Sequence, residues 1–379
     1  MSPRFAAILF AFLGLTLLER SSAQTPNETS ESKIGQELQA YFDSLAAENR
    51  LSGAILVARN GTPIASKAAG VANRATGIPN TLETKFNLGS CNKMFTAAAI
   101  AQLAQKGLLQ FGDTVGKHLP DFPNKEVGEK ITIHQLLTHT SGLGSYMGDK
   151  FAAMRAQLTT VAAYLPLIAS ESLAFNPGEK FQYSNSGYML LGAIIEKLTG
   201  QNYYDYVREN IFQPARMTAT GFYDSAKQPD DVAIGYTKMD ASGGRSEIEK
   251  ENTELREIRG GPAGGGYSTV GDLLKFNLAL RDHKLLDEEH TRLITTGKVE
   301  APGPIGKYAY GFGDKIFAGK HIVGHNGGFP GIAANFEMYP ESGYTALILM
   351  NCDPSAMMPV IMKIREILPA GQEGPSKGG

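Results

Sequence analysis

Cysteine is scarce in this chain of 379 residues, which contains only Cys91 and Cys352. Two thiols cannot build a disulfide scaffold or a cysteine-rich zinc site. The chain also has no large excess of one charge sign: 36 Lys and Arg residues are balanced by 38 Asp and Glu residues, and the net charge is −2. A nucleic-acid binder or a polybasic membrane protein needs a strong positive patch, so the composition argues against both classes.

Metal-ligand patterns are missing as well. The sequence has no His-Glu-x-x-His motif, and its seven histidines do not cluster at ligand spacing, so we expect no metal and no organic cofactor. The 43 Gly and 19 Pro residues show no period, which argues against a collagen or a repeat array. Hydrophobic residues make up 42% of the chain, as in globular proteins, and the length suits one large domain or two lobes.

The N-terminal segment 1–23 has the features of a secretory signal peptide. Arg4 is followed by an apolar run, residues 5–18, that is shorter than the roughly 20 residues needed to span a bilayer. Small residues at 21–23 then form a cleavage site. Charged residues near the cut leave an uncleaved membrane anchor as the alternative. We expect an exported protein, periplasmic or secreted, with a polar linker over 24–31 and no stable membrane span after cleavage.

A mixed order of helices and strands follows. Residues 32–50 have the period of an amphipathic helix, and two apolar runs around Asn60-Gly61 predict a β-hairpin. Strand patterns return near the C-terminus, followed by an apolar helix over 356–368. These predicted strands cover residues 310–316, 321–324, 333–339 and 344–351. The N- and C-terminal segments are therefore expected to share one sheet flanked by terminal helices.

The sequence between these segments is mostly helical and is broken by Gly and Pro. We expect one domain over 32–369, with an α/β part at about 32–89 and 265–369 and an inserted helical lobe at about 90–264. A cleft between two such parts is where functional sites are usually built.

A nucleophile-elbow pattern, G-x-S-x-G, occurs around Ser376. It lies in residues 370–379, which we predict to be a disordered tail, with no strand before it and no histidine after it. Since that motif works only as a strained strand-to-helix turn with a downstream histidine, Ser376 is not expected to be a nucleophile.

A Ser-x-x-Lys motif at Ser90 and Lys93 is a stronger candidate. Ser90 opens a predicted helix that runs to about residue 106, and a spacing of three puts Lys93 on the same face, one turn away. A lysine whose pKa is lowered by burial can take the hydroxyl proton, and the helix N-terminus offers backbone N–H groups to an oxyanion. The pattern recurs at Ser30 and Lys33, and alone it is more often a helix cap with a surface lysine.

A Tyr-x-Asn motif occurs once, at Tyr183 and Asn185, just before an apolar helix over 188–198. A residue at such a junction can face a cleft, and a tyrosine near a lysine can act as a general base. The alternative is that Tyr183 is a core residue and that Asn185 caps the helix.

The glycine-rich segment 324–331 lies between two apolar strand patterns. Its glycines let a ligand backbone approach a strand closely. His325 is a candidate for orienting a substrate or sharing protons, and the N–H of Gly328 is a candidate oxyanion donor. The alternative is a glycine-rich turn with a structural histidine.

Taken in order along the chain, the three motifs resemble those of the serine β-lactamase and penicillin-binding protein superfamily. The most similar branch is the class C β-lactamase-like serine hydrolases, which include esterases, D-aminopeptidases and carboxypeptidases. Residues 136–143, 261–272 and 343–351 are also similar to family sequences. The resemblance covers nearly the whole mature chain. It implies a β-lactamase/transpeptidase-like α/β (α+β) fold with an antiparallel sheet flanked by N- and C-terminal helices and an inserted mainly helical lobe.

The resemblance also implies roles for the motif residues. Ser90 would be the nucleophile, Lys93 its proton partner, and Tyr183 the base that activates Ser90 and later the deacylating water. The N–H groups of Ser90 and Gly328 would form the oxyanion hole. The residues that would bind the substrate are Asn185, His325, Asn326 and Gly327.

The sequence departs from true β-lactamases at two positions. His325 stands where they have Lys, and Asn326 stands where they have Thr or Ser, the residues that bind the carboxylate of β-lactams and of D-Ala termini. A neutral imidazole, with an ordinary pKa of about 6.5, attracts a carboxylate less, and we expect it to protonate as the pH falls towards about 5.5. Esters or neutral amides should therefore turn over better than penicillins.

The expected function is an exported serine hydrolase that cleaves an ester or amide bond through a Ser90 acyl-enzyme. Its partners would be small-molecule or peptide substrates (esters, D-amino-acid peptides and, as a weaker candidate, β-lactams), and no nucleic acid. The alternative is a catalytically slow penicillin-binding or cell-wall-peptide-binding sensor. Cys91 is expected to be a packing residue and His139 a structural one.

Overall fold

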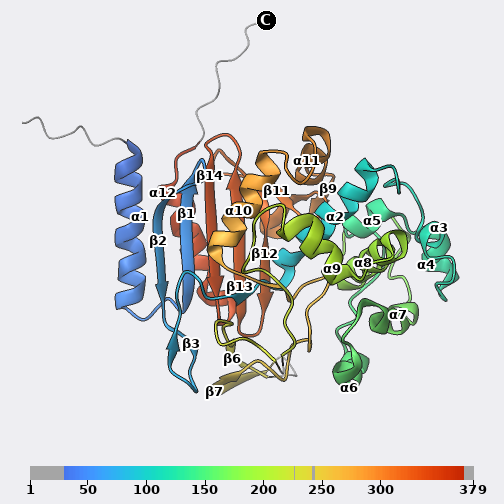
Figure 1. The fold of residues 1–379 in the computed structure, drawn as a ribbon, viewed down its shortest axis with the longest axis horizontal. Coiled ribbons are helices and arrows are strands. Elements are labelled where there is room, and N and C mark those ends of the chain that lie inside the picture. Colours follow the sequence, from blue (N-terminus) through green and yellow to red (C-terminus); the bar gives the residue numbers. More distant parts are fainter. Residues whose placement is uncertain (1–29, 226, 241–243, 371–379) are drawn as a thin grey trace, which may run out of the picture.

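A computed structural model describes residues 30–225, 227–240 and 244–370. The predicted signal peptide, nearly all of the predicted linker and the Ser376 motif lie outside these residues. Figure 1 shows one large sheet with helices on both of its sides and a group of helices beside it.

An eight-stranded sheet has the order β2-β1-β14-β13-β12-β11-β10-β9, and all neighbouring strands are antiparallel. This confirms the antiparallel sheet shared by both ends of the chain. Its strands are β1 (Gly53–Arg59), β2 (Thr62–Ala69), β9 (Val299–Ala301), β10 (Gly306–Tyr308), β11 (Gly313–Phe317), β12 (Lys320–Phe329), β13 (Ile332–Tyr339) and β14 (Tyr344–Met350). Smaller two-stranded ribbons are β3 (Val71–Asn73) with β4 (Ile78–Pro79), β5 (Phe86–Asn87) with β8 (Tyr267–Ser268), and β6 (Tyr236–Met239) with β7 (Arg245–Glu251).

Strand alternation divides the hydrophobic core between the two faces of the sheet. In β1, Ile55 and Val57 face α1 (Ser30–Ala47) and α12 (Met358–Ile367), while Ala54 and Leu56 belong to the core on the opposite face. That second core includes α2 (Lys93–Gln105) and α10 (Val270–Arg281). All residues of β14 are buried, because it lies inside the sheet with helices on both faces.

The helical lobe is built around α8 (Asn185–Thr199), whose apolar residues are buried on nearly every side. The other lobe helices are α3 (Val115–His118), α4 (Lys125–Lys130), α5 (Ile133–Leu137), α6 (Asp149–Met154), α7 (Val161–Ala169) and α9 (Tyr203–Val207), and α11 (Glu288–Thr295) follows α10.

Three details differ from the expected pattern. The predicted helical lobe contains the β6–β7 hairpin, whose strand β7 is polar and largely exposed and so carries no apolar alternation that would reveal it. The glycine-rich segment is not a turn, because residues up to Phe329 pair with β13 and extend β12. Ser30 and Glu31, assigned to the linker, begin α1.

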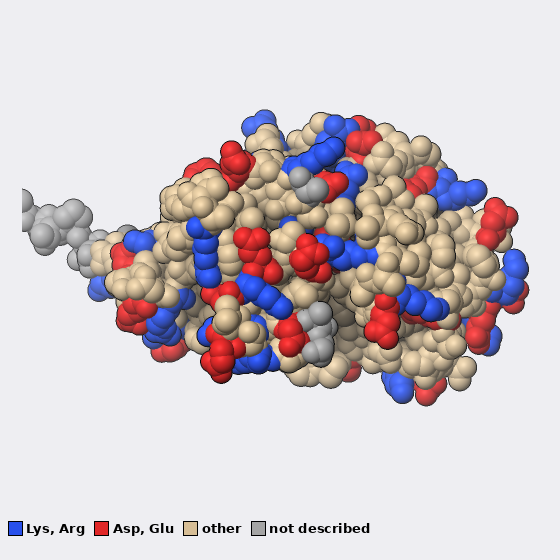
Figure 2. All heavy atoms as spheres, turned by 90° about the horizontal axis from the view of Figure 1, so that it is seen from below, with Lys and Arg blue, Asp and Glu red and all other residues tan. Residues whose placement is uncertain are grey.

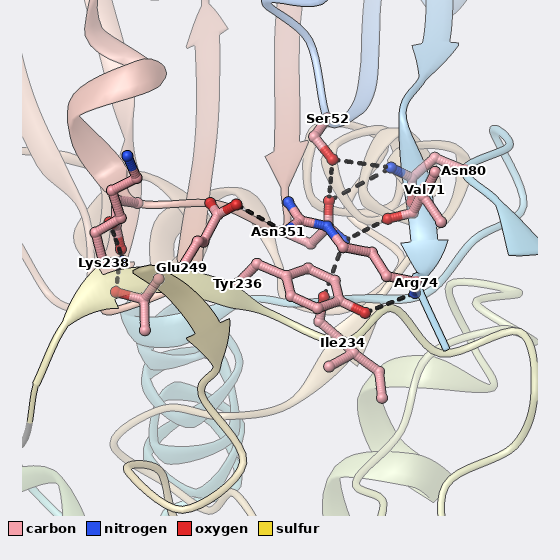
Figure 3. Close-up of polar contacts among 11 residues, drawn as sticks. Ser52, Val71, Arg74, Asn80, Ile234, Tyr236, Lys238, Glu249 and Asn351 are labelled. Atoms are coloured by element: carbon pink, nitrogen blue, oxygen red, sulfur yellow. Dashed lines mark hydrogen bonds and ion pairs between the residues drawn. The ribbon is translucent and has the colours of Figure 1, made fainter. Parts of the chain in front are cut away.

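Asn351, directly after β14, joins three segments of the chain (Figure 3). Its Nδ2 donates to the carbonyl oxygens of Val71 at 2.9 Å and Ile234 at 2.8 Å, and its Oδ1 accepts from Ser52 Oγ at 2.7 Å. One buried amide thus satisfies backbone groups that the sheet leaves unpaired.

The β6–β7 ribbon is fixed to the same region. The Arg74 guanidinium lies 4.0 Å from the centre of the Tyr236 ring and forms an ion pair with Glu249 at 2.7 Å (Figure 3). Asn252, just after β7, donates from Nδ2 to the carbonyl oxygen of Pro330 at 2.9 Å. These contacts support the turn that follows β12.

Lys and Arg side chains are interspersed with Asp and Glu over the face seen in Figure 2, which carries no large patch of one sign. Within the described ranges, no helix has both the length and the apolar character needed to cross a membrane.

Candidate active site

Ser90 lies where a short strand meets a helix. β5 pairs with β8 and fixes the chain before it, and Gly89 has a φ of +47°, a left-handed conformation that favours glycine. The 3₁₀ turn Gly89–Asn92 continues directly into α2. Ser90 and Lys93 therefore lie one turn apart, as their spacing predicts, and Ser90 lines a cleft.

Lys93 is fully buried, and three neutral oxygens hold its ammonium group. Nζ donates to the carbonyl oxygen of Ala263 at 2.5 Å, to Asn185 Oδ1 at 2.8 Å and to Ser90 Oγ at 3.4 Å. Burial lowers the pKa of Lys93 to about 7, and the Glu257 carboxylate opposes that shift. An amine with this pKa is partly neutral at neutral pH and can accept a proton.

Tyr183 precedes α8, with a partly exposed ring and a buried hydroxyl oxygen. Its ring packs on His139 with 4.2 Å between centroids, and Lys93 Nζ lies 4.7 Å from the ring centre. Oη has no well-directed hydrogen-bond partner in the described part of the chain. Burial raises the pKa of Tyr183, although the nearby Ser90 hydroxyl lowers it. The phenol therefore stays protonated at neutral pH.

The first turn of α8 is fixed by the residues around Asn185. Ser184, and not Asn185, caps the helix, since its Oγ accepts from Gly187 N. The N–H of Ser184 donates to His139 Nδ1 at 3.0 Å. Asn185 Oδ1 accepts a hydrogen bond from Lys93 Nζ, and Asn185 Nδ2 donates to Ser145 Oγ at 3.2 Å. Asn185 thus holds the lysine amine in place and ties it to Ser145 of the helical lobe.

The glycines of β12 pack against the turn that carries Ser90. A Cβ atom at Gly327 would lie 2.0 Å from the carbonyl oxygen of Leu88 and 2.9 Å from Ser90 N, so this approach requires glycine. A Cβ atom at Gly89 would lie 3.2 Å from Gly328 N. The backbone nitrogens of Ser90 and Gly328 therefore belong to two segments in direct contact, an arrangement that suits an oxyanion.

His325 is buried on the opposite side of β12 from Asn326, and both of its ring nitrogens are engaged. Nδ1 lies 2.5 Å from the Asn326 carbonyl oxygen and must donate to it, so Nε2 accepts from Tyr308 Oη at 2.8 Å. Burial and then the Lys93 charge lower the pKa of His325 to about 3. The expectation that His325 protonates near pH 5.5 is therefore wrong, because the imidazole is dehydrated and satisfied as the neutral form.

Ser90 and Tyr183 border a cavity of about 230 Å³. His325, the exposed side chain of Asn326 and Gly328 also line it. The structure thus brings all three sequence motifs to one cleft.

Cys91 is fully buried beside Ser90, and its Sγ donates to the carbonyl oxygen of His325 at 3.0 Å. Burial raises the pKa of this thiol, which suits a packing residue rather than a nucleophile. In the described ranges, no three His, Cys, Asp or Glu side chains gather in a way that could hold a metal ion.

Comparison with known proteins decides the family, because the sequence matches the beta-lactamase family over residues 38–368. This chain belongs to the beta-lactamase family. It is 32% identical over 334 residues to penicillin-binding protein 4* of Bacillus subtilis (strain 168), a match that covers 83% of this chain and 71% of that protein.

Solved structures of the family's fold agree with this result. The penicillin-binding protein of Bacillus halodurans superposes with a TM-score of 0.75 at 32% identity, covering 86% of this chain and 99% of that one. A D-stereospecific amidohydrolase from Streptomyces sp. superposes with a TM-score of 0.67 at 26% identity, covering 86% and 95%. The chain therefore has the fold of penicillin-binding proteins and related serine hydrolases.

Several site residues of this beta-lactamase-family chain were not predicted individually. Tyr308 holds the His325 ring, Ala263 accepts from Lys93, and Glu257 opposes the fall of the Lys93 pKa. Of these, only Ala263 lies in a stretch that the sequence marked as similar to the family. His139 was expected to be structural, and its contacts with Ser184 and Tyr183 agree with that role.

Proposed function

We propose that this protein is an exported serine hydrolase that cleaves an ester or amide bond through an acyl-enzyme on Ser90. One observation carries the proposal. Lys93 is fully buried, its Nζ lies 3.4 Å from Ser90 Oγ, and its pKa is lowered to about 7. A helix cap with a surface lysine, the alternative for this motif, would leave the amine in water.

In the acylation step, neutral Lys93 takes the hydroxyl proton as Ser90 Oγ bonds to the substrate carbonyl carbon. The N–H groups of Ser90 and Gly328 stabilise the carbonyl oxygen as it becomes an oxyanion. Collapse of this intermediate breaks the bond to the alcohol or amine, which leaves with the proton from Lys93. Water then attacks the acyl group, gives its proton to Lys93 and releases Ser90 with that proton.

The environment of Tyr183 supports a different role from the phenolate base implied by the family resemblance. Its pKa is raised by burial, and its Oη has no well-directed partner in the described residues. A protonated phenol beside Lys93 suits passing the Lys93 proton on to the leaving group, since it can donate its own proton while accepting that of Lys93. Lys93 is then the base of the resting enzyme.

Neutral esters and amides are the favoured substrates, and the neutral His325 supports that choice. The likeness to a D-stereospecific amidohydrolase makes D-amino-acid amides the first amides to try. The relatives named as penicillin-binding proteins favour one second candidate, a slow sensor that is acylated and barely hydrolysed.

A substrate panel separates these functions. It contains p-nitrophenyl esters, D-aminoacyl amides and a chromogenic cephalosporin, each run on wild type and on Ser90→Ala. Continuous turnover that is lost in Ser90→Ala supports the hydrolase. A stoichiometric burst without further turnover supports the sensor, and turnover unaffected by Ser90→Ala rejects both.

A further inference from the structure

The cavity beside Ser90 continues past the motif residues to the α12 face of the sheet. Besides the motif residues, its lining includes residues of β11, β12, β13 and α12. Those used below are Gly313, Gly324, Lys315, Asn335, Glu337 and Arg365. None of them has a role in the acyl-enzyme chemistry described above.

The ladder between β11 and β12 ends at two facing glycines in this part of the cavity. β11 pairs with β12 only as far as Gly313 opposite Gly324, so no strand of the described part of the chain lies beside β12 on that edge from His325 onward. Neither glycine has a side chain, and a Cβ atom at Gly324 would clash with the carbonyl oxygen of Phe336, so β13 fills the space beside Gly324. The hollow therefore lies along the edge of β12 that β11 leaves unpaired. Two isoleucines also line this part of the cavity: Ile305, which lies next to Gly313, and Ile361 of α12.

The side-chain amide nitrogen of Asn335 is an unpaired polar group beside this hollow. Asn335 is opposite Asn326 in the β12–β13 register and is 4% exposed, and its Nδ2 has no hydrogen-bond partner in the described part of the chain. A buried amide donor without a partner carries a free-energy cost, because the hydrogen bond that it makes to water in the unfolded chain is lost. An acceptor on a bound molecule would remove that cost.

The far end of the cavity carries more positive than negative charge. Glu337 is opposite Gly324 and is paired with Arg365, whose Nε lies 3.1 Å from Oε1. Lys315 Nζ lies 3.8 Å from the same oxygen, too far for a good hydrogen bond. Lys315 and Arg365 thus share one carboxylate, and Glu337 is the only acidic residue among the described residues that line the cavity.

Burial lowers the pKa of Lys315, against the attraction of Glu337. A second carboxylate beside its ammonium group would stabilise the charged form. The cation in this cavity that can pair with a substrate carboxylate is therefore Lys315, which lies 3.8 Å from Glu337, and not the neutral His325 next to Ser90.

We infer that this extension binds an arm of the substrate that ends in a carboxylate, with Asn335 donating to a polar group along the arm and Lys315 pairing with its end. The inference rests on the proposed function, because it assumes that the substrate reacts at Ser90. Gly328 marks the reacting carbonyl, and Gly324 lies opposite Glu337 at the charged end of the cavity. These glycines are four residues apart on one strand, so the arm spans roughly 13 Å from the scissile bond. The substrate class is an ester or amide that is neutral near the reacting carbonyl and acidic at a distance.

The test uses matched p-nitrophenyl esters whose acyl arms, about 13 Å long by the strand spacing, end in either a carboxylate or a primary amide. A second matched series carries the arm on the leaving group of an amide. For each protein we measure the ratio of kcat/KM for the acid over that for the amide. Using a ratio within one variant cancels any loss of folded protein.

Wild type should prefer the acid at least about fivefold in one series, the effect of about 1 kcal/mol. Lys315→Gln should bring that ratio close to one. Lys307→Gln is the matched control, because Lys307 lies on the neighbouring strand β10 with an exposed side chain, and it should keep the wild-type ratio. Asn335→Leu should raise KM for both members of the pair without changing the ratio.

A wild-type ratio near one in both series, or a preference that survives Lys315→Gln, would overturn the inference while Ser90-dependent turnover leaves the proposed function standing. If no ester or amide is turned over at all, the proposed function fails and the substrate arm fails with it.

Discussion

Two Ser-x-x-Lys turns in this chain share a pattern and differ in everything around it. Ser30 and Lys33 lie in the first turn of α1, and both are exposed. Ser90 and Lys93 lie at the start of α2, where the lysine is fully buried and its pKa is lowered to about 7. The spacing supplies one turn of helix in both places. At the second turn the serine itself lines the cleft, the glycines of β12 pack against it, and the lysine amine is buried.

The comparison teaches that the motif specifies geometry and the fold supplies reactivity. The backbone around Ser90 packs against Gly327 and Gly328 because β12 continues past the end of β11. Water is kept from Lys93 by α8 and by the loop that contains Ala263. Paired substitutions at the two turns test this distinction.

The largest difference is expected between Ser90→Ala and Ser30→Ala. Removing the nucleophile should lower kcat/KM for a p-nitrophenyl ester by at least about 10⁴-fold, since the other residues cannot form the acyl-enzyme. Ser30→Ala should retain wild-type kcat/KM. Steady-state kinetics on both variants, with circular dichroism to verify folding, checks this; equal losses would remove the distinction between the two turns.

Lys93→Met compared with Lys33→Met should give the next largest effect. Methionine keeps the apolar length of the side chain and removes the base, so kcat should fall about 10²- to 10⁴-fold. Lys33→Met should leave kcat unchanged. Single-turnover acylation rates measure the step directly, and wild-type acylation by Lys93→Met would show that another group takes the Ser90 proton.

Local patterns predicted much of this fold. The hairpin of β1 and β2 and the C-terminal strands follow from apolar alternation and turn residues. Each motif was a weak candidate by its own pattern, and the family resemblance of the three motifs together selected the site residues. The boundaries of β12 were missed because its glycines resemble a turn until their pairing with β13 is known.

Contacts between distant segments could not be predicted from the sequence. Tyr308 Oη donates to His325 Nε2 from beyond β11, and burial and the Lys93 charge lower the pKa of His325. The β6–β7 ribbon was missed because Arg245–Glu251 has polar residues on both faces. Such features depend on register and packing, which one sequence does not contain.

Replacing His325 by Lys should change substrate preference by a smaller amount. The ordinary pKa of lysine lies about four units above that of histidine, so a lysine in this buried site carries a positive charge at pH values where the imidazole is neutral. That charge near the reacting carbonyl should favour a cephalosporin over a neutral ester by about 5- to 150-fold, corresponding to about 1–3 kcal/mol. In wild type, His325 should not change the ratio of kcat/KM for the cephalosporin over that for the ester between about pH 7.5 and 5.5. Its pKa of about 3 keeps the imidazole neutral over this range. A ratio of kcat/KM that does not change in His325→Lys would contradict this account of anion preference.

The smallest effect concerns the pH profile. Because the neutral form of Lys93 is the base and its pKa is about 7, kcat/KM for a neutral ester should fall as the pH drops below about 7. Asn185→Asp would put a carboxylate beside the ammonium group, which raises the Lys93 pKa and moves the midpoint about one unit or more towards alkaline pH. A profile whose midpoint stays in place would show that Lys93 does not control it.

Covalent labelling tests the central claim, that Ser90 is the residue acylated, most directly. Wild type is treated with a fluorophosphonate or penicillin probe and analysed by intact-protein and peptide mass spectrometry, alongside Ser90→Ala, Ser30→Ala and a chain lacking residues 370–379. The account predicts one adduct, on the peptide containing Ser90, that is absent from Ser90→Ala and unchanged in the other two. An adduct that persists in Ser90→Ala and disappears on removal of residues 370–379 would contradict it.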